Sequence, residues 1–126
     1  MILRILFLLL FSTLALAKEP IHIVFDIDWT LVYPLEEKPN YTDSQVIQIE
    51  NKWYRFTDFS GETLEKLSQL PDVKISFFSG GLAERNRELL SKLILPSGKS
   101  AEQIAFKILN FNDLTEIDKN TKKKIH

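Results

Sequence analysis

The chain of 126 residues contains no cysteine. It therefore has no disulfide bond, no cysteine-based zinc site, no thiol nucleophile and no amino-terminal cysteine to carry a lipid. An excess of charge of one sign is also lacking, because 16 basic residues stand against 17 acidic ones and the formal net charge is −1. This balance gives no electrostatic basis for binding nucleic acid, and we predict no such partner. Hydrophobic residues make up 44% of the chain, which excludes a disordered tail protein and favours one small folded domain.

No hydrophobic run is long enough for a stable transmembrane helix, which needs roughly 20 apolar residues. The longest run covers residues 5–14, follows the single positive charge of Arg4 and is followed by the small-x-small pattern of residues 15–17. This arrangement is typical of a secretory signal peptide. We therefore predict a signal peptide over residues 1–17, a mature domain over residues 18–126 and a periplasmic or secreted location, with no stable membrane span after cleavage. The alternative is an uncleaved amino-terminal anchor.

Strand-like and helix-like patterns alternate along the rest of the chain. Residues 21–25 and 73–78 are near-continuous runs of apolar, strand-forming residues, as in buried parallel strands. Helical patterns cover residues 61–70 and 82–94. This order predicts an α/β domain with a parallel sheet, because right-handed crossover connections join parallel strands.

The expected helices carry recognisable end signals. Ser60 is expected to cap the first helix, and Ser100 with Gln103 forms the pattern of a capping box for a further helical turn. Residues 105–111 fit either a continuation of that turn or a third strand. The apolar positions expected to pack inward are Leu64, Leu67 and Leu70 in the first helix and Leu82, Leu89, Leu90 and Leu93 in the second. The positions expected to face outward in the second helix are Glu84, Arg85, Arg87 and Glu88.

A β-hairpin is expected between the first strand and the first helix. Residues 46–50 and 53–57 are both rich in strand-forming residues, and Asn51 with Lys52 has the composition of a two-residue turn. The pattern predicts a small β-hairpin insert over about residues 45–57.

Two aspartates follow the first expected strand. Asp26 and Asp28 are two residues apart, so their side chains point to roughly the same side. Ligands of open α/β sheets bind at this carboxyl end of the strands. Two close carboxylates repel each other, so either one is protonated or a cation lies between them. A hard cation with oxygen ligands, Mg²⁺ above all, suits this pair.

The second expected strand ends in Ser79, Gly80 and Gly81. The glycines allow the backbone to approach a ligand closely, and the helix that begins after them offers unpaired N–H groups and a positive dipole end. A hydroxyl, free amides and a helix start together predict an anion site suited to a phosphate.

The pattern Asp26-x-Asp28-x-Thr30 after a hydrophobic strand, followed by a second hydrophobic strand that ends in Ser79, resembles the first two motifs of the haloacid dehalogenase superfamily. The resemblance implies that Asp26 is a nucleophile that forms an aspartyl-phosphate and that Asp28 is the general acid and base. It also implies that Ser79, Gly80 and Thr30 bind phosphate and that Asp26 and Asp28 hold Mg²⁺. The competing interpretation is a pair of strand-capping aspartates and an ordinary turn.

Within the superfamily, the sequence Asp28-Trp29-Thr30 followed by a hairpin and a short helix is most similar to the carboxy-terminal-domain phosphatase and Nuclear LIM interactor branch. The resemblance implies a Rossmann-like parallel sheet with flanking helices and a small β insert. Trp53 and Tyr54 either face the substrate or pack the hairpin onto the body. Trp29 occupies a position that is commonly glycine or another small or polar residue, and we expect it to wall the pocket or to pack inward.

The third and fourth motifs of the superfamily are not identified. The candidates for the third-motif lysine are Lys99, Lys107, Lys122, Lys123 and Lys124. The acidic candidates for the fourth motif are Asp113, preceded by Asn112, and Asp118. Asp113 comes only 34 residues after Ser79, which is short for a helix, a lysine and a strand. We therefore expect a sheet that is incomplete at its carboxyl end, with an exposed apolar flank on the first strand and a tendency to associate.

The function predicted from these residues is that of an exported, Mg²⁺-dependent phosphatase or phosphotransferase. It would act on a phosphorylated substrate through an aspartyl-phosphate intermediate, and the incomplete motifs predict low activity for the chain itself. The alternative function is that of a non-catalytic binding module, or a degenerate or truncated enzyme, with the same fold.

Overall fold

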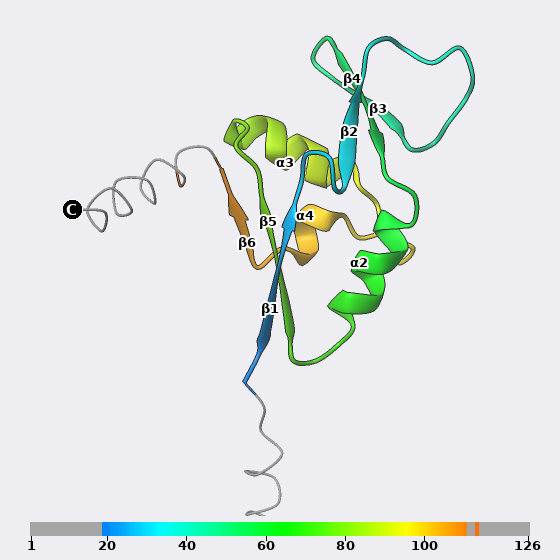
Figure 1. The fold of residues 1–126 in the computed structure, drawn as a ribbon. Helices are drawn as coiled ribbons and strands as arrows, with labels where there is room; N and C mark the ends of the chain where they lie inside the picture. The colour runs from blue at the N-terminus through cyan, green and yellow to red at the C-terminus, as the bar shows by residue number, and fades with distance from the viewer. Residues whose placement is uncertain (1–18, 111–112, 114–126) are drawn as a thin grey trace, which may run out of the picture.

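A computed structural model describes residues 19–110 and residue 113, drawn as the coloured ribbon in Figure 1. The predicted signal peptide, Asn112, Asp118 and the lysines at positions 122–124 lie outside the described residues. The strands are β1 (Ile21–Asp26), β2 (Val32–Leu35), β3 (Val46–Ile49), β4 (Lys52–Phe56), β5 (Val73–Phe78) and β6 (Lys107–Leu109). The helices are α2 (Ser60–Ser68), α3 (Ala83–Lys92) and α4 (Ala101–Ile104).

The predicted α/β class with a parallel sheet is confirmed. β1, β5 and β6 form one sheet in the order β1-β5-β6, and both pairs of neighbours are parallel. Ile21 lies opposite Val73 at the start of β1, and Asp26 lies opposite Phe78 at its end. The segment after α4, which the sequence left open, is a strand, because the backbone turns extended at Ala105 and then pairs with β5.

One hydrophobic core lies between a face of this sheet and the three helices. Ile75 and Phe77 of β5 are buried there against Leu64 of α2, Leu89 and Leu90 of α3. Since side chains alternate along a strand, Phe25 and Ile27 face this core while Val24 and Asp26 face the other side of the sheet. The core therefore fixes the direction in which the residues after β1 emerge.

The predicted hairpin is part of a second, antiparallel sheet with the order β2-β4-β3. This sheet lies beyond the carboxyl end of β1 in Figure 1. Its two-residue turn is Glu50-Asn51, one residue earlier than expected, because Ile49 pairs with Lys52. Glu50 takes the left-handed conformation that the turn requires, with φ of 53°. The register places Tyr54 in the core.

Two expectations about helix starts were wrong, and one was confirmed. Ser60 is the first residue of α2 rather than its cap, which is Phe59 with φ of 63°. The Ser60 hydroxyl is buried without a hydrogen-bond partner among the described residues. Leu82 is the N-cap of α3 and is exposed, as is Leu70 after α2, so neither belongs to the packed stripe. The capping box of α4 is present, since Ser100 and Gln103 exchange both expected hydrogen bonds, at 2.8 and 3.2 Å.

The outer side of β1 is open in the part of the chain that the structure describes. There, β1 has β5 as its one hydrogen-bonded neighbour. Ile21 and Val24 of this strand are 59% and 57% exposed. Over the described ranges, no helix is both long enough and apolar enough to cross a membrane.

Candidate functional site

The carboxyl ends of β1 and β5 bring the two sequence motifs together. The Ile27 N–H donates a hydrogen bond of 2.8 Å to the Phe78 carbonyl, so the parallel pairing continues one residue past β1. Asp28 follows Ile27, and Ser79 follows Phe78. The Ser79 hydroxyl donates a hydrogen bond to Asp28 Oδ2. These two residues are 51 positions apart in the sequence. The sheet therefore positions a carboxylate and a hydroxyl side by side.

Arg85 of α3 lies in this site, so the expectation that it faces outward was wrong. Its Nη1 donates to Asp28 Oδ1 at 2.7 Å, and its Nη2 donates to Asp28 Oδ2 at 2.6 Å. The same Nη2 donates to Ser79 Oγ at 2.8 Å. Arg85 points inward because its bidentate ion pair with Asp28 and its hydrogen bond to the Ser79 hydroxyl compensate the loss of hydration of the guanidinium.

The charges of this pair stabilise each other. The hydrogen bond from Arg85 is the largest effect on Asp28 and lowers the pKa of that carboxyl below its ordinary value, with a smaller lowering by Ser79. Partial burial opposes the change. The hydrogen bond to Asp28 likewise raises the pKa of Arg85. Both groups are therefore charged at neutral pH.

Asn86, the next residue of α3, binds the guanidinium of Arg85 through its side-chain oxygen. It is fully buried, and its Oδ1 accepts hydrogen bonds from Arg85 Nε at 3.2 Å and Nη2 at 2.8 Å. Its Nδ2 donates to the carbonyl of Gly81 at 3.3 Å and to Asn110 Oδ1 at 2.9 Å. Asn110 directly follows β6, so this side chain links α3 to the sheet.

Arg85, Asn86 and Asn110 were missed as site residues by the sequence analysis. A signal for the first two was present, because positions 85 and 86 lie one helical turn before Leu89, which is buried. Polar residues on the inner face of a helix need buried partners. Nothing in the sequence singles out Asn110.

The two glycines after β5 differ, because Gly80 lines the cavity beside Asp28 while Gly81 contacts other residues of the site. The Gly81 N–H donates to Ser79 Oγ at 3.0 Å, so this amide serves the site's own hydroxyl. A Cβ on Gly81 would lie 2.3 Å from Arg85 Nη2 and 2.8 Å from its Cζ. The residue that approaches this backbone closely is therefore Arg85.

Three residues next to Asp28 face solvent. Asp26 ends β1 and is exposed, on the side of the sheet away from the core. Thr30 is exposed, and its carbonyl accepts a hydrogen bond of 2.8 Å from the Thr57 hydroxyl. Trp29 is 74% exposed, so the idea that it packs inward was wrong. Its φ of 66° explains why a glycine would suit this position.

A cavity of about 400 Å³ opens beside the ion pair. Asp28, Gly81 and Arg85 form one wall, and Lys52 and Tyr54 of the hairpin contribute to the other. The two aromatic residues of the hairpin differ in position, because Tyr54 lines this cavity and Trp53 does not. The Lys38 Nζ lies over the Trp53 ring, 5.4 Å from its centroid. Ser79 is buried next to Asp28 and Arg85, and the predicted nucleophile Asp26 is not among the described residues that line this cavity.

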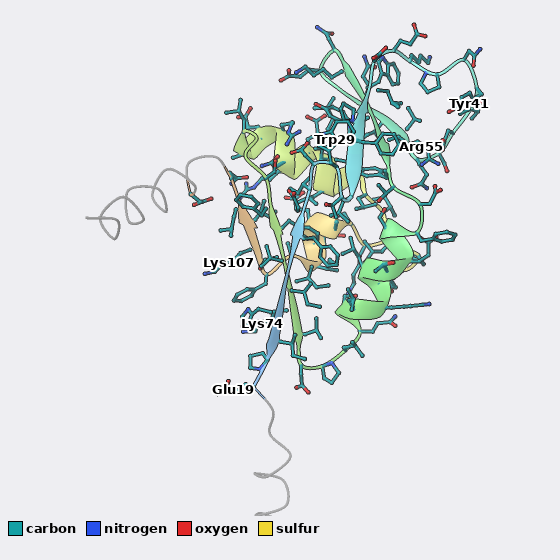
Figure 2. The ribbon with its side chains drawn as sticks, viewed as in Figure 1. Glu19, Trp29, Tyr41, Arg55, Lys74 and Lys107 are labelled. Carbon is teal, nitrogen blue, oxygen red and sulfur yellow. The ribbon has the colours of Figure 1, made fainter. Side chains whose placement is uncertain are left out.

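The described candidates for the missing motifs lie elsewhere. Lys99 lines a separate cavity with Val73, at the end of the sheet opposite the site. The Lys107 Nζ lies 5.7 Å from the Phe106 ring centroid, beside β6 (Figure 2). The Asp113 carboxylate accepts a hydrogen bond of 2.7 Å from the Asn110 N–H and so closes the turn after β6. In the described residues, the cations at the cavity are therefore Arg85 and Lys52.

Comparison of the chain with protein-family models, curated proteins and solved structures finds no match. The chemistry of the site follows from its own groups. A guanidinium and a hydroxyl bind anions, and a carboxylate can act as a nucleophile or move a proton. Across the described ranges, no group of three or more histidine, aspartate or glutamate side chains is placed to hold a metal ion.

Proposed function

We propose that this chain is a phosphatase or phosphotransferase of the haloacid dehalogenase superfamily, with that superfamily's Rossmann-like core. The observation that supports the proposal is the hydrogen bond between Ser79 and Asp28. It joins two sequence motifs that the superfamily uses together, at the carboxyl ends of adjacent parallel strands.

In the proposed reaction, a carboxylate oxygen of Asp26 attacks the phosphorus of a phosphomonoester. The bond between phosphorus and the leaving oxygen breaks, and Asp28, which is ionised before the substrate binds, passes to that oxygen the proton that the phosphomonoester monoanion brings. Asp28 then removes a proton from water, which attacks the aspartyl-phosphate and releases phosphate with Asp26 restored. In a phosphotransferase, an alcohol takes the place of this water.

The donors of the site suit Mg²⁺. Asp26 offers two hard oxygen atoms, is exposed, and accepts no hydrogen bond on its side chain from any described residue. Mg²⁺ is commonly held by one or two carboxylates together with water and substrate phosphate. The carboxylate of Asp26 and the backbone carbonyl of Asp28 would hold the ion, which would neutralise part of the charge of the phosphoryl group.

The test is hydrolysis of an aryl phosphate by the purified protein with Mg²⁺. Asp26→Asn is expected to reduce turnover below a few per cent of the wild-type rate, because an amide does not attack phosphorus. Asp72→Asn, which changes an exposed aspartate at the other end of the sheet, is the matched control and is expected to retain activity. Full activity in Asp26→Asn, or in metal-free protein with a chelator, would refute the proposal.

Asp28→Asn separates the role of the proton donor from that of the nucleophile. Its turnover is expected to fall strongly for alkyl phosphates and less for aryl phosphates with acidic leaving groups, which need little protonation. An equal loss for both classes of substrate would remove the general-acid role of Asp28.

A second candidate is a binding module that takes up phosphate without reacting with it. The ion pair between Asp28 and Arg85 favours this candidate, because it engages the proposed acid. The two functions are distinguished by incubation with acetyl phosphate and Mg²⁺, followed by mass spectrometry. An enzyme gains the mass of one phosphoryl group on Asp26, whereas a binding module keeps its mass.

We also propose that the protein is exported. The support is the sequence pattern of residues 1–17. Expression of the full chain and mass analysis of the exported fraction are expected to give a mature terminus at Lys18. Material that retains Met1 would support the alternative, an uncleaved anchor.

A further inference from the structure

The groups that would receive a phosphate are engaged with one another in the structure. Arg85 binds both carboxylate oxygens of Asp28 and the hydroxyl of Ser79. The Ser79 hydroxyl also binds Asp28. A phosphate that enters from the cavity reaches Ser79 only after one of these charged partners has moved aside.

Asp28 and Arg85 are not held equally. The guanidinium is bound from behind by the fully buried Asn86 and lies against Gly81, where a side chain would not fit. Asn86 is in turn bound to Asn110. Asp28 lies in the turn after β1, and its side chain is 32% exposed, against 22% for Arg85. The carboxylate is therefore the partner that can turn away.

A phosphate and a carboxylate present the same pattern to a guanidinium. In both, two oxygens accept a parallel pair of N–H donors, and a phosphate carries more negative charge. The two Nη atoms of Arg85 bind the Asp28 carboxylate, and both residues line the cavity.

We propose that Arg85 is the phosphate-binding residue of this site, and that Asp28 occupies the place of the phosphate on Arg85 in the ligand-free protein. Phosphate exchanges with the carboxylate on the guanidinium and on Ser79, and the released Asp28 turns toward the leaving group. This inference rests on the proposed function for its substrate, a phosphomonoester, but the exchange itself concerns anion binding and requires no turnover.

The test is binding of inorganic phosphate to the full chain, measured by calorimetry at constant salt. Arg85→Gln is expected to weaken binding at least tenfold, and Arg85→Lys is expected to recover only part of it, because a lysine makes no bidentate pair. Asp28→Asn is expected to tighten binding severalfold, since the competing carboxylate is removed. Arg87→Gln and Glu84→Gln carry the same changes of charge on exposed positions of α3 and are the matched controls.

The opposite signs of the two effects separate exchange from a structural role. If Arg85 and Asp28 only stabilise the fold, Asp28→Asn leaves phosphate binding unchanged or weakens it, and this result overturns the inference. No binding by either the wild type or Asp28→Asn also overturns it. Phosphate binding that depends on Arg85 without any hydrolysis refutes the proposed function alone. Hydrolysis with an unchanged KM in Arg85→Gln refutes the inference alone.

Discussion

The guanidinium of Arg85 fills the space that a side chain on Gly81 would need, since a Cβ there would lie 2.3 Å from Arg85 Nη2. Gly81 lies between β5 and α3, and Arg85 lies in the first turn of α3. The absence of a side chain at position 81 is therefore a condition for the ion pair between Arg85 and Asp28.

Gly81→Ala is expected to displace the guanidinium while leaving the fold intact, because the end of an arginine side chain can move. Phosphate binding should weaken about tenfold, the change that corresponds to roughly 1.4 kcal/mol. The double variant with Arg85→Gln should bind no more weakly than Arg85→Gln alone, since both changes act through one group. Additive losses, measured by calorimetry, would show that Gly81 acts on the ligand directly.

Trp29→Gly is expected to stabilise the protein. Trp29 has φ of 66° and is 74% exposed, so glycine removes backbone strain with little loss of packing. The left-handed conformation costs about 1–2 kcal/mol for residues with a Cβ, and the free energy of unfolding in urea should rise by about 1 kcal/mol. Tyr41→Gly is the control, because Tyr41 is also exposed but has no positive φ. It should be neutral or destabilising.

Asp43→Asn is expected to reduce the loss of folding stability at low pH. The hydrogen bond from Arg55 and the backbone N–H of Gln45 lower the pKa of Asp43 below its ordinary value of 3.8. The ionised carboxylate therefore contributes stability above about pH 4, and this contribution is lost as the pH falls through the lowered pKa. Urea midpoints between pH 2 and 6 should fall less steeply in the variant. Glu37→Gln, at an exposed glutamate without an ion pair among the described residues, should behave as wild type.

Val24→Lys is expected to reduce self-association. Val24 is exposed on β1, which in the described part of the chain has β5 as its one neighbour. A charge on an open strand discourages pairing with another copy. Sedimentation velocity should show a larger monomer fraction in this variant than in Leu70→Lys, which adds the same charge at an exposed residue after α2. Equal behaviour of the two variants would indicate that β1 is not the associating surface.

β1 and β5 could be predicted because their apolar runs are continuous and end at chemically distinctive residues, whereas β6 was left open between a helix and a strand because its three residues are too few to show a period. The capping box at Ser100 could also be predicted, since it depends on two residues three positions apart. The turn of the hairpin was placed one residue late, because Asn51 and Lys52 have the more typical turn composition. Ile49 and Tyr54, which enter the core, decide the register instead.

The main error at the site concerned Arg85, which was expected to face outward, and Asn86 was missed. Polar helical residues were assigned to the outer face from the sequence. This assignment fails for a polar side chain whose hydrogen-bond partner is distant in the sequence. Arg85 obtains its partner from a position 57 residues earlier, and Asn86 from one 24 residues later. The spacing from Leu89 indicates the inner face for both residues, but local periodicity does not identify either partner. Whether Asp26, Asp28 and Ser79 perform the predicted chemistry stays a prediction.

The hairpin shares the hydrophobic core of the main sheet. Ile49, Tyr54 and Phe56 are buried in the same cluster as Leu89 and Leu90 of α3, and Lys92 Nζ donates a hydrogen bond of 2.9 Å to the Gln48 carbonyl. Swinging the hairpin away would expose these apolar side chains to water, so it does not behave as a hinged flap. The packing of the hairpin on the main core therefore also positions Lys52 and Tyr54 at the cavity.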